Sequence, residues 1–300
     1  MTHRRAVALM VLCTLLWGIA GVVTRHLDAA RSFEVTFWRS LFNAAGLVVA
    51  LLFMRGAGLW QEIRGGGRAL WFSGLCWAVM YTNFMLALTL TTVATVLVTL
   101  AVAPLITALF SRVFLHHRLP ARTWAAIGLA GLGIAWMFGR QAFAAGTSMT
   151  GALVALGVPI AAAANWTLLQ HVHARHVADP TIEEPQMLPA VLLGAAISAA
   201  ATLPLALPFS ATPHDLGWLA LLGVVQLAIP CLIVVRLTKV LAAPEISLLG
   251  LLEVIFGVLL AWVGAGEAPG SDALVGGALV LAALIGNEWW ALRQRSTVLG

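Results

Sequence analysis

An acidic residue in the middle of a long apolar run is the strongest candidate for chemistry in this sequence. Glu253 stands within LLGLLEVIFGVLLAWVGAG, where its neighbours are apolar. If this run crosses a bilayer, an ionised carboxylate near its centre costs about 3 kcal/mol or more, so Glu253 must be protonated, paired or in contact with a wet cavity. Two interpretations stay open. Glu253 either packs its segment against neighbouring helices as a hydrogen-bonded acid, or it couples proton movement and balances a substrate ammonium.

A second charged side chain, Arg39, lies inside the apolar run 33–54, about 9 Å from its start at 1.5 Å per residue. A long arginine side chain at this depth can carry its charge to the membrane surface, and we expect Arg39 to reach the outer interface. A salt bridge with Glu253 and capture of a substrate carboxylate are the alternatives. Gln226, near the middle of the run 214–235, is an uncharged candidate for contact with a cavity.

Aromatic and amide side chains form the third group of candidates. Tyr81, the only tyrosine, precedes Asn83 by two residues, and the two could stack on a substrate and bond its polar groups. They cannot share one helix face, and an asparagine often joins helices instead. Trp17 and Trp166 are separated by 149 residues and could line a pocket from two sides. Twelve tryptophans are scattered through the chain, so packing and interfacial positions are the alternative.

The histidines do not predict a metal site or a catalytic centre. His171 and His173 point to different faces of a helix, and no cysteine or carboxylate stands at ligand spacing from them. His176 is expected to be at a solvated helix end, as is the pair His116-His117. A membrane enzyme would need an acid and a histidine at one depth. We therefore expect no catalytic residues, no bound metal and no cofactor.

Other familiar chemistries are also missing. A phosphate-binding loop needs Gly-Lys followed by Ser or Thr, but the single lysine, Lys239, follows Thr238. ATP hydrolysis is therefore not expected. Cys13, Cys76 and Cys231 all fall within apolar runs, which predicts packing residues rather than disulfides. The net charge of +5 reflects basic loops beside an anionic membrane leaflet, and not nucleic-acid binding.

These side chains are positioned by apolar segments that are long enough to cross a bilayer. Of the 300 residues, 61% are apolar and 10% are charged, which leaves too little polar surface for a soluble protein. A membrane-spanning helix needs about 20 apolar residues, and no ten-residue alternation of the barrel kind occurs. The sequence predicts an all-α integral membrane protein with ten helices. Their expected bounds are 6–24, 33–54, 69–89, 93–114, 121–139, 149–170, 186–207, 214–235, 244–263 and 272–292.

Basic residues predict the orientation, because positive loops stay in the cytoplasm. A cytoplasmic N-terminus places 13 of the 17 basic residues inside, and an even number of helices returns the C-terminus to the same side. The outer loops then keep Arg25, Arg31 and Arg140. The inner set is Arg4, Arg5, Arg55, Arg64, Arg68, Arg112, Arg118, Arg122, Arg175, Arg236, Lys239, Arg293 and Arg295.

Residues 92–140 and 242–290 look like two copies of one unit. Aligning them places Ala103-Pro104 on Glu253-Val254 and His117 on Glu267. We expect a first repeat at 1–145 and a second at 146–300 within one compact membrane domain. Since each repeat has an odd number of helices, the second must enter the membrane from the opposite side. Inverted repeats of this kind suit alternating access around a central site.

The whole pattern resembles a known family. TLLWGIAGVVTRHL, Arg39, TTVATVLVTLAVAPL and LLGLLEVIFGVLLAWVGAGE are similar, in order and spacing, to the drug/metabolite transporter superfamily, in particular to ten-helix exporters with two EamA-like repeats. The family usually has an acidic residue where this chain has His117, and Glu-Pro where it has Glu253-Val254. Because that proline is missing, we expect the segment 244–263 to run straighter than in the family.

The resemblance implies a bacterial inner-membrane exporter of small metabolites, with apolar and aromatic amino acids as the first substrate class and cationic drugs as the alternative. It also implies that helices 1, 3, 4, 6, 8 and 9 line the cavity. Expected partners are a small-molecule substrate and the lipid bilayer, without nucleic acid, and a monomer is the expected state. The candidate cavity residues are Trp17, Tyr81, Asn83, Trp166, Gln226 and Glu253, with Arg39 as a charge partner.

Overall fold

A computed structural model describes residues 1–30, 32–91, 93–116, 119–142, 148–181, 185–266 and 270–298. The predictions for Arg31, His117, Arg118, Glu267 and the repeat boundary at 145 lie outside these residues. The elements are α1 (His3–Val23), the 3-10 turn η1 (Thr24–His26), α2 (Ser32–Arg55), α3 (Gly58–Gly65), α4 (Arg68–Leu90), α5 (Val93–Leu100), α6 (Ala103–Phe114), α7 (Ala121–Ala142), α8 (Met149–Ala178), α9 (Pro189–Ala206), α10 (Pro213–Leu221), the π-helix η2 (Leu222–Ala228), α11 (Ile229–Leu237), α12 (Ala243–Gly250), α13 (Leu252–Ala265) and α14 (Ser271–Val298).

The predicted fold class is confirmed: the protein is an all-α membrane protein with ten crossing segments in two inverted repeats. Nine segments of the described chain are long and apolar enough to cross a membrane, and the tenth is the shorter apolar helix Ser271–Asn287. The sequence analysis did not anticipate α3, an eight-residue helix in the connection between α2 and α4.

Besides Pro230 of α11, which continues directly from η2, proline stands in the first turn of four helices for a local reason. Pro104, Pro189, Pro213 and Pro244 all stand in the first turn of their helices. The first backbone N–H groups of a helix have no partner within it, so a residue that lacks this N–H loses nothing there. These positions fix where α6, α9, α10 and α12 begin.

Three of the crossing segments are not continuous α-helices. The fourth divides into α5 and α6 at Ala101-Val102, and the ninth divides into α12 and α13 at Leu251. The eighth contains the π-helix η2 between α10 and α11. The segment 244–263 is thus interrupted at Leu251, and the expectation that it runs straighter than in the family stays a prediction. A break occurs without proline, at a position that matches the break in the first repeat.

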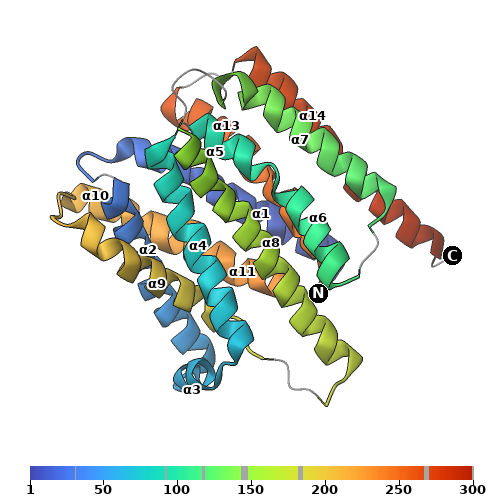
Figure 1. Ribbon diagram of the computed structural model, residues 1–300, viewed down its shortest axis with the longest axis horizontal. Coiled ribbons are helices and arrows are strands. Elements are labelled where there is room, and N and C mark those ends of the chain that lie inside the picture. Colours follow the sequence, from blue (N-terminus) through green and yellow to red (C-terminus); the bar gives the residue numbers. More distant parts are fainter. Residues whose placement is uncertain are drawn as a thin grey trace.

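The helices form two three-segment bundles that mirror the duplication (Figure 1). In the first, α1 packs against α13, α12, α11 and η2. In the second, α8 packs against α4, α5 and α6. We call these the α1 bundle and the α8 bundle. Helix α2 packs on α9 and η2, and α9 packs on α2 and α4, so this pair joins both bundles.

The remaining two helices, α7 and α14, run side by side at one edge of the molecule (Figure 1). A Cβ atom added to Gly133 would lie 2.7 Å from the carbonyl oxygen of Gly276, and one added to Gly276 would contact the carbonyl oxygen of Gly133. These two glycines therefore allow α7 and α14 to approach each other closely. Gly128 and Gly131 face open space instead.

The two bundles meet at one end of the molecule and not equally at the other. Helix α12 packs on α6 and α8 of the opposite bundle. Its counterpart α5 makes no comparable contact with α13 or α1 in the described part of the chain. We call the end at which α12 packs on the α8 bundle the closed end. It also holds the N-terminus, since His3 Nε2 pairs with Glu245 Oε1 of α12 at 2.5 Å.

Candidate functional site

A cavity of about 180 Å³ lies between the two bundles. It receives side chains from α1, α2, α4, α5, α6, α8, η2, α11, α12 and α13. This agrees with the expectation that helices 1, 3, 4, 6, 8 and 9 line a cavity and adds Arg39 of helix 2. The residues that line it include Trp17, Arg39, Trp77, Tyr81, Phe84, Trp166, Gln226, Ser247, Gly250, Leu251 and Glu253.

The aromatic side chains come mainly from the α8 bundle. Trp77 lies 5.6 Å from Tyr81 and 5.3 Å from Trp166 between ring centroids, the second pair at an interplanar angle of 78°. Trp77, Tyr81 and Trp166 are all buried. Trp17 lies on the wall formed by α1 and is partly buried. The structure therefore brings the symmetric pair Trp17 and Trp166 to one cavity.

The charged and amide side chains come from the α1 bundle and the adjacent α2. Arg39 is buried, with 5% of its surface exposed, so the expectation that it reaches the outer interface was wrong. Its Nε and Nη2 atoms donate to Oε1 of Gln226 at 3.2 and 3.0 Å. Nε2 of Gln226 donates to the carbonyl oxygen of Trp17 at 3.2 Å. A buried acceptor thus offsets the cost of removing the guanidinium from the membrane surface.

Glu253 lines the same cavity from the first turn of α13 and is partly exposed to it. It forms no ion pair with Arg39 within 4 Å. The sequence required Glu253 to be protonated, paired or in contact with a cavity, and the structure places it at a cavity. Two opposite charges therefore face one cavity without cancelling at contact distance.

Asn83 is not among the cavity residues. Its Nδ2 atom donates to the carbonyl oxygen of Val154 at 3.2 Å and so joins α4 to α8. A Cβ atom added to Gly157 would collide with this amide, which shows how closely the helices approach. The neighbouring Thr82 bonds to Ser198 of α9 at 2.9 Å. Both are interhelical contacts, the alternative that the sequence left open for Asn83.

Two aromatic cavity residues, Trp77 and Phe84, were missed by the sequence analysis. They stand four residues before and three residues after Tyr81, and residues at these spacings share one face of a helix. Helical periodicity around Tyr81 would have identified both. They did not stand out by residue type, because the chain has twelve tryptophans and twelve phenylalanines.

The helix breaks lie at the cavity itself. Ala103 begins α6, Leu251 separates α12 from α13, and both line the cavity, as do Ser247 and Gly250. Irregular backbone is tolerated at membrane depth where it borders such a space. The beginnings of α6 and α13 therefore present helix N-termini, which carry partial positive charge, near the site.

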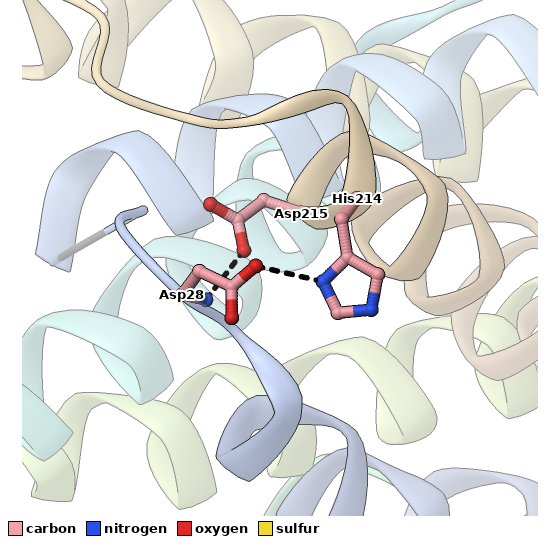
Figure 2. Close-up of side chains that lie close together, drawn as sticks. All are labelled: Asp28, His214 and Asp215. Carbon is pink, nitrogen blue, oxygen red and sulfur yellow. Dashed lines mark hydrogen bonds and ion pairs between the residues drawn. The ribbon is translucent and has the colours of Figure 1, made fainter.

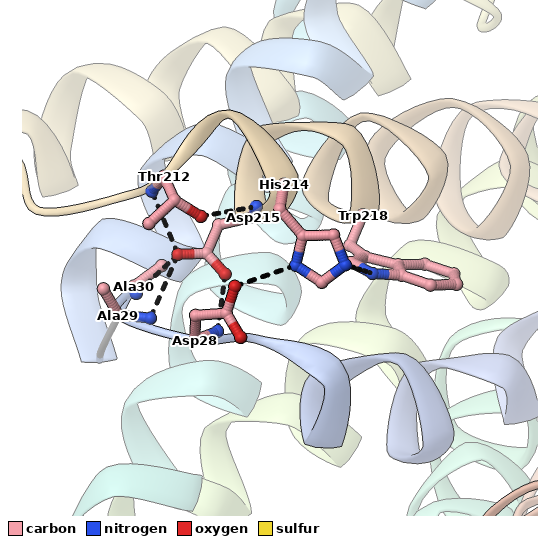
Figure 3. A network of polar contacts seen from close by, with 7 residues as sticks. All are labelled: Asp28, Ala29, Ala30, Thr212, His214, Asp215 and Trp218. Carbon is pink, nitrogen blue, oxygen red and sulfur yellow. Dashed lines mark hydrogen bonds and ion pairs between the residues drawn. The ribbon is translucent and has the colours of Figure 1, made fainter.

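A second polar group ties the loop after α1 to the segment before α10 (Figure 3). Asp215 is fully buried, and its carboxylate accepts hydrogen bonds from the backbone N–H groups of Asp28, Ala29, Ala30 and Thr212 at 2.6 to 3.1 Å. Thr212 completes a capping box at the start of α10. The carboxylate thus fixes the loop after α1 to the start of α10.

Glu34 makes the reciprocal connection. From the first turn of α2, its carboxylate accepts from the N–H groups of Ser210 and Ala211 at 2.9 and 2.8 Å and from the Ser210 hydroxyl at 2.7 Å. We call Asp215 and Glu34 the loop clasp. Sequence reasoning missed it because most of its contacts are to backbone N–H groups of distant loops, although Thr212 and Asp215 stand at the spacing of a capping box.

The side chains of Asp28, His214 and Asp215 lie close enough to hold a cation (Figure 2). Both oxygens of Asp215 already accept backbone hydrogen bonds, however, and His214 Nδ1 bonds Asp28 Oδ2 at 3.0 Å. Trp218 Nε1 donates to the remaining nitrogen of His214 at 3.0 Å. These contacts use the atoms that a metal would need, and the group acts as part of the loop clasp.

Comparisons with known proteins agree with this architecture. The family model described as "EamA-like transporter family" matches residues 4–139 and 149–287. "Uncharacterized transporter PA0485" of Pseudomonas aeruginosa is 27% identical over 142 residues, which cover 45% of this chain and 48% of that protein. The match thus spans about half the length of that relative.

A solved crystal structure of another protein shares the fold, with a TM-score of 0.78 and 17% identity over 98% of this chain and 99% of the other. At that identity the likeness concerns the fold alone. The family model matches the chain twice, once in each half of the sequence, and the two matches together cover most of it. The chain belongs to the EamA-like transporter family.

Proposed function

We propose that this transporter exports apolar and aromatic amino acids across the bacterial inner membrane by alternating access. The observation that carries the proposal is the division of the cavity into a charged side and an aromatic side. Arg39 and Glu253 suit the carboxylate and ammonium groups of one small zwitterion, while Trp77 and Trp166 suit its side chain. Helix N-termini at the breaks favour the same carboxylate.

The size of the cavity supports a small substrate. Its volume of about 180 Å³ resembles that of an engineered cavity of about 150 Å³ that binds benzene. Sites for drug-sized ligands begin at about 300 Å³. A single aromatic ring with a short polar end fits this space better than a large cationic drug.

The arrangement of the bundles supports the mechanism. One end of the cavity is closed by α12 against α6 and α8, while the symmetric contact of α5 is not made in the described chain. Exchange of these two arrangements would open one end as it closes the other. With the N-terminus in the cytoplasm, the closed end is the inner one. The proposal includes a first repeat at 1–145, a second repeat at 146–300 and a monomeric transporter.

Efflux from bacterial cells tests the direction and the substrate together. Cells loaded with labelled phenylalanine or leucine should lose it faster when they express the protein, and slowly again when they express Trp77→Ala or Arg39→Gln at equal membrane abundance. Trp60→Ala, on the surface helix α3, is the control and should behave like the wild type. Equal efflux with all these variants would contradict the proposed site.

Export of cationic compounds is the second candidate, because Glu253 is a cavity carboxylate with no ion-pair partner within 4 Å among the residues that the structure describes. It requires Glu253 as the counter-charge. Efflux of a monovalent cationic dye that is lost in Glu253→Gln but kept in Trp77→Ala would favour this function over amino-acid export.

A further inference from the structure

Gln226 uses both ends of its side-chain amide inside the protein. Its Oε1 atom accepts two hydrogen bonds from Arg39, and its Nε2 atom donates to the backbone of Trp17. Only 2% of its surface is exposed. The amide is therefore held in one orientation, and it holds two bonds of the guanidinium in turn.

The local backbone explains how Gln226 reaches Arg39. Gln226 lies in the π-helix η2, whose wider turn interrupts the eighth crossing segment, and such turns are frequent at functional sites. Gly223 in the same turn approaches α2 so closely that an added Cβ atom would lie 2.7 Å from Asn43 N and 2.8 Å from the Arg39 carbonyl oxygen. The π-helix thus fits against the turn of α2 that carries Arg39.

The chemical nature of the partner matters as much as its position. An amide oxygen orients a guanidinium but does not neutralise it, whereas a carboxylate would do both. The bonds to Gln226 occupy Nε and Nη2 and leave both N–H groups of Nη1 outside that contact. With no ion pair to Glu253 within 4 Å, Arg39 presents its charge to the cavity.

We propose that Gln226 is a positioning residue that fixes the Arg39 guanidinium with its charge uncompensated, which makes a carboxylate an obligatory part of the substrate. The inference rests on the proposed function of amino-acid transport and specifies it further. A free amine with the same aromatic ring lacks the group that Arg39 binds and is not transported.

The test compares phenylalanine with phenethylamine, which has the same ring and amine but no carboxylate. Purified protein in proteoliposomes should take up labelled phenylalanine and not labelled phenethylamine. Gln226→Glu places a carboxylate against Arg39 and should raise the KM for phenylalanine about tenfold or more with a smaller change in kcat. The same variant should begin to move phenethylamine.

Two further variants keep the result interpretable. Gln226→Met retains the length of the side chain but not its hydrogen bonds, so the KM for phenylalanine should rise without any uptake of the amine. If Gln226→Glu does not fold, this variant decides the matter. Gln61→Glu makes the same chemical change on the exposed surface of α3 and should match the wild type in both assays.

Each outcome bears on one of the two proposals. Uptake of phenylalanine and phenethylamine at equal efficiency by the wild type would overturn the obligatory carboxylate while leaving transport in place. A wild-type KM for phenylalanine in both Gln226 variants would overturn the positioning role. Failure of the wild type to move any amino acid would overturn the proposed function, and this inference with it.

Discussion

Arg39 and Glu253 show how two charges are kept inside a membrane protein without cancelling each other. Arg39 is bonded to a neutral amide, and Glu253 borders a cavity instead of lipid. Buried ionisable groups are costly and are retained where they line a substrate or ion pathway. The two residues are therefore the ones whose replacement should change transport without changing the fold.

Replacement of Glu253 by Gln tests whether this acid couples transport to protons. The amide keeps the size of the side chain but cannot exchange a proton, so we expect uptake driven by an imposed pH gradient to be lost. Exchange of substrate at equal pH should continue with a raised KM, because the amide no longer pairs with the substrate ammonium. The measurement is initial uptake in proteoliposomes between pH 6 and 8. Uptake with the normal rate and normal pH dependence would show that Glu253 is not the coupling acid.

The site could be predicted from the sequence only in part. Glu253, Arg39 and Gln226 stand out because polar residues are rare inside apolar runs, and all three line the cavity. Arg39 was wrongly predicted to reach the outer interface, because its depth along the helix does not reveal which neighbour accepts its hydrogen bonds. That neighbour, Gln226, is 187 residues away in the sequence.

At the scale of elements, the crossing segments follow from apolar length alone, but their interruptions do not. The first repeat signals its break through Pro104. The second breaks at Leu251 with no proline nearby, and its backbone there lines the cavity. Tertiary surroundings, and not local propensity, make that break acceptable. The duplication was the available signal, since matched positions in two repeats tend to share a backbone.

The contact between α7 and α14 depends on the absence of a side chain at Gly276. Gly276→Ala adds a methyl group that would collide with Met137 and with the backbone of Gly133. We expect the free energy of unfolding to fall by about 1 to 3 kcal/mol, the usual cost of overpacking, and the melting temperature in detergent to fall with it. Gly131→Ala, which faces open space in the same helix pair, is the matched control. Equal melting of the two variants would contradict the close packing.

The loop clasp makes a second prediction at this scale. Asp215→Asn replaces one carboxylate oxygen by an N–H donor that faces a backbone N–H group. At least the bond from Asp28 N is therefore lost at a buried position, together with the charge that the other N–H groups bind. We expect destabilisation of about 2 kcal/mol or more. Asp272→Asn, at the exposed start of α14, should melt like the wild type. The clasp would be unimportant if both variants melted at the same temperature.

At the scale of the whole molecule, the duplication provides matched positions at the two ends of the cavity. Leu97 on α5 and Ser247 on α12 differ by 150 residues, the offset that aligns Ala103 with Glu253, and both line the cavity. Alternating access predicts that solvent reaches them in turn. Because α12 is packed against the opposite bundle here, Leu97 should be the more accessible of the two in this arrangement.

Cysteine labelling measures this exchange directly. In a background with Cys13, Cys76 and Cys231 replaced, Leu97→Cys should react with a membrane-impermeant thiol reagent from outside, and Ser247→Cys should react from inside. A transported substrate should change the two rates in opposite directions. Parallel changes, or reaction of both positions from one side, would argue against a two-state exchange of the bundles.

The central claim is that one cavity carries small amino acids across the membrane. Its most direct test is uptake by purified protein in proteoliposomes, with a labelled panel of apolar, aromatic and charged amino acids and a cationic dye, each with and without a proton gradient. We predict saturable uptake of apolar and aromatic amino acids and none of the dye. Movement of the dye alone would contradict the claim and assign the cavity to cationic compounds.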